Sequence, residues 1–206
     1  MIEEIITYLT KTYAPSVILP YGSYASGTNN QDSDFDALVV TDRPGSGHDS
    51  SMVAGVRLDV FLYPPQHFQE AFDPEEIVQI FDGTPVVDQE GLGAELLRRV
   101  GAYLDAYQAK PRERVAQDVA WCGKMARRCQ RGDPEGFYRW HWLLRDSLEI
   151  YYDLRGRYFF GPKKALAVME REDPISYRLY AQALAKLDQA ALEAWTGRME
   201  ELLENG

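Results

Sequence analysis

The spacing of hydrophobic residues divides this chain into two parts. In residues 1–93, short apolar runs with the two-residue spacing of strands alternate with helical patterns, beginning with an amphipathic helix at residues 2–13. In residues 94–206 the apolar residues recur at helical spacing throughout. The pattern predicts an α/β (α+β) unit with a mixed sheet flanked by helices, followed by an all-α helical bundle.

Apolar runs bounded by polar or turn-forming residues mark the strands expected in the first part. Asp73-Pro74 predicts the start of a helix, with Asp73 as the N-cap and Pro74 at the first helical position. The other expected segments are a strand at 17–21, a strand at 35–40, a Gly/Ser-rich loop at 44–50, paired strand segments at 51–62 and a short strand at 85–88.

The second part repeats the Asp-Pro signature of a helix start at Asp133-Pro134 and at Asp173-Pro174. Between such signals the apolar residues keep the spacing of helices that bury one face. The predicted helices cover residues 94–108, 112–131, 134–156, 163–171, 174–187 and 189–204.

Three carboxylates are expected along one edge of the sheet. Asp34 and Asp36 stand at the start of the apolar run 35–40, and alternate residues of a strand point to the same side. In a second run Asp59 alternates with apolar residues, so a neighbouring strand would bring it beside the pair. Carboxylates held this close repel one another unless a divalent cation lies between them, and hard oxygen ligands suit Mg²⁺. The arrangement predicts a site for two magnesium ions.

The segment before these acids has the features of an anion site. Gly22 directly follows the apolar run that ends at Tyr21, and glycine lets the backbone approach an anion closely. Ser23 adds a hydroxyl, and the turn that follows would offer free N–H groups to a phosphate.

Together these residues resemble the nucleotidyltransferase superfamily of the DNA polymerase β type. The resemblance covers about the first third of the chain and is carried by Gly-Ser-x-Ala-x-Gly, Ser-Asp-x-Asp and a later strand aspartate. The matching residues are Gly22, Ser23, Ala25, Gly27, Ser33, Asp34, Asp36 and Asp59.

This resemblance implies an enzyme that transfers a nucleoside monophosphate from a nucleoside triphosphate, with ATP the expected donor, to an acceptor hydroxyl. Pyrophosphate would leave. It implies that Gly22 and Ser23 hold the β and γ phosphates, that Asp34 and Asp36 hold both metal ions and that Asp59 holds the catalytic one. Because this chemistry consists of positioning and charge neutralisation, it requires no covalent nucleophile from the protein.

The segment from Asp32 to Asp36 contains two overlapping Asp-x-Asp pairs. We prefer Asp34 and Asp36, because Phe35 already belongs to the apolar run and Ser33-Asp34 fits the family pattern. Asp32 is then expected to be a solvated turn residue or a helper of the metal ligands.

Charge is distributed unevenly along the chain. Residues 1–95 contain 3 Lys and Arg against 16 Asp and Glu, a balance of −13, whereas residues 96–206 contain 19 against 16, a balance of +3; the sum is the formal net charge of −10. The first part therefore attracts metal ions and cationic acceptors, and the second must supply most basic groups for a triphosphate. This acidity argues against nucleic acid as the acceptor.

The helical part resembles, in architecture alone, bacterial enzymes that adenylylate aminoglycoside or lincosamide antibiotics. Asp146 and Glu149 share one face of a predicted helix, where they could bind a cationic acceptor. One of them, Glu149 before Asp146, could be the general base, and Asp59 could take that role instead. The alternative to a binding role is a solvated helix face on which Glu149 pairs with Arg145.

Related enzymes carry a basic residue after this helix that reaches the triphosphate, which makes Lys163 the expected nucleotide ligand.

The sequence leaves the acceptor open. A small hydroxyl-bearing molecule of aminoglycoside or lincosamide type is our first expectation, and transfer to a protein hydroxyl is the alternative within enzymes. A role outside enzymes is that of an antitoxin-type binding module, as in minimal nucleotidyltransferases. The sequence also leaves open whether a homodimer completes the cleft.

With no long apolar run and no signal peptide at the N-terminus, we expect a cytoplasmic protein without a membrane partner.

Overall fold

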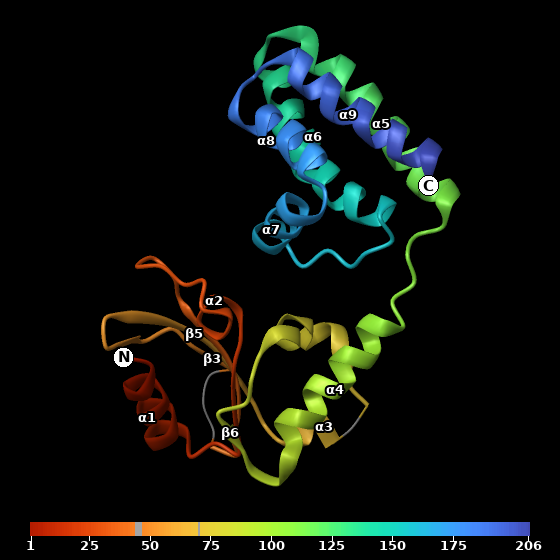
Figure 1. Cartoon of the computed structure of the whole chain (residues 1–206). Coiled ribbons are helices and arrows are strands. Elements are labelled where there is room, and N and C mark those ends of the chain that lie inside the picture. The colour runs from red at the N-terminus through yellow and green to blue at the C-terminus, as the bar shows by residue number, and fades with distance from the viewer. Residues whose placement is uncertain (44–46, 70) are drawn as a thin grey trace. The chain divides into compact units, whose positions relative to one another are not determined.

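The computed structural model describes residues 1–43, 47–69 and 71–206. The chain forms two compact units, Met1–Ala106 and Tyr107–Gly206, which are described separately (Figure 1).

The first unit is built on a mixed sheet with the strand order β3-β5-β2-β1-β6, to which β4 is added by pairing with β5. Only β2 and β5 pair in parallel among the described ladders, and the remaining pairs are antiparallel. The strands are β1 (Val17–Pro20), β2 (Phe35–Val40), β3 (His48–Asp49), β4 (Met52–Val53), β5 (Val56–Tyr63) and β6 (Val87–Asp88).

Helices cover both faces of this sheet, as Figure 1 shows. Helix α1 (Ile2–Tyr13) packs Ile5 and Leu9 on one face, together with the odd-numbered side chains of β2. The even-numbered face of β2, with Leu38 and Val40, packs against the short helix α3, the 3-10 segment η1 and α4. Their bounds are Gln66–Gln69, Pro74–Asp82 and Leu92–Asp105, and shorter helical turns lie at α2 (Gly22–Ser26) and η2 (Gln89–Gly91).

Most predicted elements of the first unit are present, with differences at the less regular positions. The Gly/Ser-rich loop expected at 44–50 lies outside the described residues at 44–46, while His48–Asp49 form strand β3 rather than loop. The predicted helix after Asp73 exists as a 3-10 segment, and the Asp73 side chain accepts a hydrogen bond from the backbone N–H of Glu75. That cap is the one predicted from Asp73-Pro74.

Helix α4 belongs with the first unit, although the sequence analysis placed most of it in the helical bundle. Its Leu96 and Val100 are fully buried in the cluster that contains Val17 and Leu19 of β1. The helical spacing of these residues was read correctly, but spacing alone does not say against which element a helix packs.

The second unit is a bundle of five α-helices in the part of the chain from Tyr107 onward. Its core surrounds Trp195, which is fully buried and donates a hydrogen bond from its indole nitrogen to the Ser147 hydroxyl. Asp133 and Asp173 cap their helices as predicted. The helices are α5 (Arg112–Arg128), α6 (Pro134–Leu154), α7 (Pro162–Glu172), α8 (Pro174–Ala185) and α9 (Gln189–Asn205), with a 3-10 turn η3 (Cys129–Arg131) after α5.

None of the helices described is both long enough and apolar enough to cross a bilayer.

Candidate active site

Asp36 and Asp59 face each other across neighbouring strands. The parallel register of β2 and β5 pairs these two residues directly. Adjacent strands lie roughly 4.8 Å apart, and laterally paired residues point to the same side of a sheet, so the two carboxylates stand side by side. Both are partly exposed, whereas Leu58 and Val60 on the opposite side of β5 are buried. The alternation read from the sequence therefore agrees with the observed faces of β5.

The other acids of this segment lie outside the strand. Asp34 is exposed immediately before β2, and Asp32 is exposed in a turn where its backbone N–H donates to the Asn30 side chain at 2.9 Å. Across the described ranges, no three His, Cys, Asp or Glu side chains are grouped closely enough to hold a metal ion between them. The structure thus brings together Asp36 and Asp59, with Asp34 two residues upstream.

Gly22 lies directly against the Asp36 carboxylate. The residue opens α2 with a φ of +69°, and a Cβ built on it would lie 2.6 Å from Oδ2 of Asp36. Only a residue without a side chain leaves this space open, so the glycine is required by a close approach as well as by its backbone conformation. The next residue, Ser23, is 7% exposed.

Tyr21 borders the same acidic pair. Its side chain is buried, and its backbone N–H donates to the Asp36 carbonyl at 3.1 Å. Burial raises the pKa of Tyr21 far above its ordinary value, and the negative charges of Asp36 and Asp59 raise this pKa further. The phenol is therefore protonated throughout the neutral range and adds no charge to the site.

His48 is the residue that the sequence analysis missed. Strand β3 places its Nε2 2.6 Å from Oδ1 of Asp59, and its ring packs against Phe61 with the ring centroids 4.9 Å apart. An ionised carboxylate can only accept a hydrogen bond, so Nε2 carries the proton when Asp59 is ionised. The contact holds one Asp59 oxygen and leaves the other available. No motif marked this histidine, because a two-residue strand has no readable periodicity.

The residues predicted on the helical part lie in the second unit. Asp146 and Glu149 are on α6, Asp146 partly exposed and Glu149 exposed, and the structure shows no ion pair between Glu149 and Arg145. Lys163 is exposed in the first turn of α7. Their roles toward acceptor and nucleotide stay predictions.

A comparison with protein families finds a match within the first unit. The family model described as "Nucleotidyltransferase domain" matches residues 2–87. Among solved structures, a nucleotidyltransferase-like protein from Exiguobacterium sibiricum aligns with a TM-score of 0.42 and 16% sequence identity, covering 98% of this chain and 74% of that chain. No curated protein matches. The segment that is similar to this family, residues 2–87, holds the Asp36–Asp59 pair.

Proposed function

We propose that the first unit transfers a nucleoside monophosphate, AMP if ATP is the donor, to a hydroxyl of a small-molecule acceptor. The acceptor oxygen attacks the α phosphorus, the bond from that phosphorus to the bridging oxygen breaks, and pyrophosphate leaves with the electron pair. The observation that carries this proposal is the direct pairing of Asp36 with Asp59, beside the Gly22 backbone, in the segment that is similar to the nucleotidyltransferase family.

The paired carboxylates of Asp36 and Asp59 form a donor set that suits Mg²⁺. Magnesium is usually bound by one or two carboxylates together with substrate phosphates and waters, rather than by a cage made only of protein groups. Asp36 and Asp59 supply the two adjacent carboxylates, and Asp34 is near enough in sequence to add a third. When bound, the ions would neutralise charge on the phosphates and on the leaving group.

Residues of the chain itself position the phosphate and the metal ligand and accept the acceptor proton. Gly22 keeps space open next to Asp36, so that a phosphate oxygen and the backbone can approach each other. His48 fixes the orientation of Asp59, and the neutral Tyr21 phenol closes the site on the β1 side. A carboxylate takes the proton of the acceptor hydroxyl, and Asp59 is our first choice for this role because it stands beside the proposed metal site.

The test is a transfer assay with purified chain, Mg²⁺ and ATP labelled at the α phosphate. The acceptors are aminoglycosides, lincosamides and candidate proteins, offered separately. Labelled small-molecule product together with pyrophosphate supports the proposal, and labelled protein instead supports the alternative of transfer to a protein hydroxyl. Absence of any labelled product across the panel, combined with stable capture of a helical partner protein, would favour the antitoxin-type role and contradict the proposal.

A further inference from the structure

The second unit has a hollow along α5 and α6, which is lined by Asp146 and Glu149 but contains neither Asp36 nor Asp59. Its volume is about 450 Å³, within the range of small-molecule sites. Two kinds of side chain line it, tryptophans and charged residues, and the argument rests on their combination.

The tryptophans form an aromatic wall. Trp121 of α5 and Trp142 of α6 meet edge to face, with ring centroids 5.7 Å apart, and Trp142 is 40% exposed. The indole face carries negative electrostatic potential and attracts organic cations. A large ring left in contact with solvent beside a hollow is therefore a surface on which a cationic ligand can stack.

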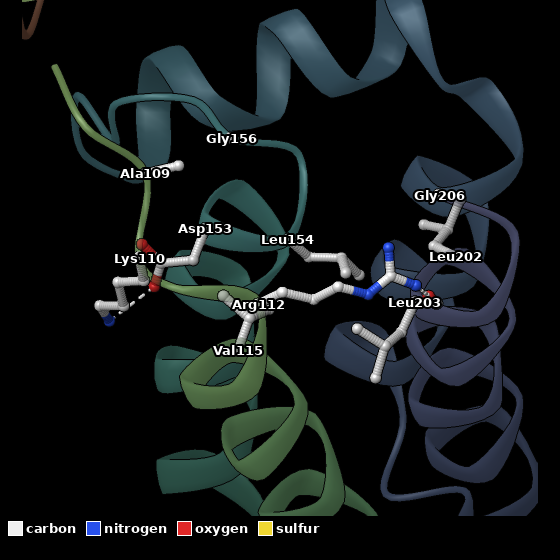
Figure 2. A pocket seen from close by; sticks show the side chains of 10 residues that line it. All are labelled: Ala109, Lys110, Arg112, Val115, Asp153, Leu154, Gly156, Leu202, Leu203 and Gly206. Atoms are coloured by element: carbon white, nitrogen blue, oxygen red, sulfur yellow. Dashed lines mark hydrogen bonds and ion pairs between the residues drawn. The ribbon is translucent and has the colours of Figure 1, made fainter.

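The basic residues in the lining are already neutralised. Lys110 donates to Asp153 at 2.6 Å, a contact drawn in Figure 2, and Arg114 pairs with Asp118 at 3.5 Å. The Asp153 contact raises the pKa of Lys110, so this lysine stays charged and bound to its partner. Each of the two cations is thus matched by its own carboxylate.

Two further carboxylates of the lining take part in no ion pair within the described ranges. Asp146 and Glu149 line the hollow from α6, and neither makes a hydrogen bond or ion pair with any residue that the structure describes. They follow Trp142 by four and seven residues, which places all three side chains on one face of the helix. The lining thus holds more carboxylates than cations beside the exposed Trp142 ring, and the Lys110 charge that Asp153 binds also attracts Glu149.

We propose that this hollow binds an organic ammonium ion, with the cation against Trp142 and within reach of Asp146 and Glu149. A small inorganic ion would use the carboxylates without the ring, and a neutral aromatic ligand would use the ring without the carboxylates. An alkylammonium uses both. Identifying this cation with the acceptor rests on the function proposed above; the binding site itself does not.

Choline and 3,3-dimethylbutan-1-ol, which has the same shape without the charge, test the proposal in the absence of nucleotide and Mg²⁺. All 4 tryptophans lie in the second unit, so their fluorescence reports on it alone. We expect choline to bind at low salt and the alcohol at least about tenfold more weakly. Equal binding of both compounds, or no binding of choline, would overturn the proposal.

Substitutions in the lining of the hollow test whether choline binds there. Trp142→Leu and the double change Asp146→Asn with Glu149→Gln should each weaken choline binding about tenfold or more. Glu170→Gln is the matched control, because Glu170 is an exposed acid of α7 outside the hollow. Circular dichroism checks that each variant is folded. Unchanged binding in folded variants would contradict the site, whereas choline binding without nucleotide transfer would contradict only the proposed function.

Discussion

His48 and Asp59 are joined across strands β3 and β5, with Nε2 and Oδ1 2.6 Å apart. The contact restricts the Asp59 carboxylate on one side while its register partner Asp36 stands on the other. Groups that orient a metal ligand in this way commonly change metal affinity or activity by about 10- to 100-fold when they are removed. His48 is therefore expected to position Asp59 without touching the substrate.

His48→Ala should weaken the binding of Mn²⁺, used as a spectroscopic substitute for Mg²⁺, by about tenfold. His48→Gln should retain most of the affinity, because its amide nitrogen can still donate to Asp59. His141→Ala is the control, since His141 is an exposed histidine of the second unit. Electron paramagnetic resonance measures the free ion directly. Equal affinity of His48→Ala and the unchanged chain would show that the contact does not serve metal binding.

A comparison of Gly22→Ala with Gly27→Ala distinguishes the effect of a steric clash with Asp36 from the effect of backbone strain. Both glycines have a φ of +69°, so either alanine is strained by about 1 kcal/mol. Only the Cβ at position 22 would meet Asp36, whereas nothing lies within 4 Å of a Cβ at position 27. We expect both variants to lose similar stability, while Gly22→Ala alone loses transfer activity by at least about tenfold. Equal activity of the two would disprove a role for this approach.

Asp173 is expected to be a main contributor to the stability of the second unit. It is 11% exposed and accepts hydrogen bonds from the backbone and hydroxyl of Ser176 and from the Tyr151 hydroxyl. Asp173→Ala should cost about 2 kcal/mol at neutral pH, measured by urea unfolding with tryptophan fluorescence. Asp188→Ala, which removes an exposed cap with one bond to Ala190, should cost about half as much.

This cost should depend on pH. Burial alone would raise the pKa of Asp173, but the hydrogen bonds from Ser176 and Tyr151 outweigh it and the pKa is lowered. A lowered pKa in the folded state means that the stabilisation is complete above the unfolded value near 4 and is lost as the pH falls through the folded value. The difference between Asp173→Ala and the unchanged chain should therefore shrink in acid. A difference that grows in acid would contradict this account.

The sequence was sufficient where a local pattern determines the structure. Alternation in residues 56–62 separated Asp59 from its apolar neighbours, and the strand at 35–40 placed Asp36 on a definite face. The Asp-Pro pairs at 133–134 and 173–174 specified helix starts through their own side chains. In each case the determining contacts lie within a few residues of one another.

The sequence was insufficient where contacts join distant segments. The pairing of His48 with Asp59 depends on a short strand returning beside β5, and the docking of α4 on the first unit depends on which apolar surface meets Leu96. The pair of Glu149 with Arg145, which was the alternative to a binding role, needs only local contacts and is not formed either. An arginine four residues before a glutamate is the weaker orientation on a helix.

The most direct test of the account compares Asp36→Asn with Asp32→Asn in the same transfer assay. Both substitutions remove one carboxylate charge within the same short segment, but only Asp36 is paired with Asp59, while Asp32 lies in an exposed turn. The account predicts that Asp36→Asn lowers the rate of pyrophosphate release at least about a hundredfold with its fold intact, and that Asp32→Asn stays near the original rate. An active Asp36→Asn beside an inactive Asp32→Asn would contradict it.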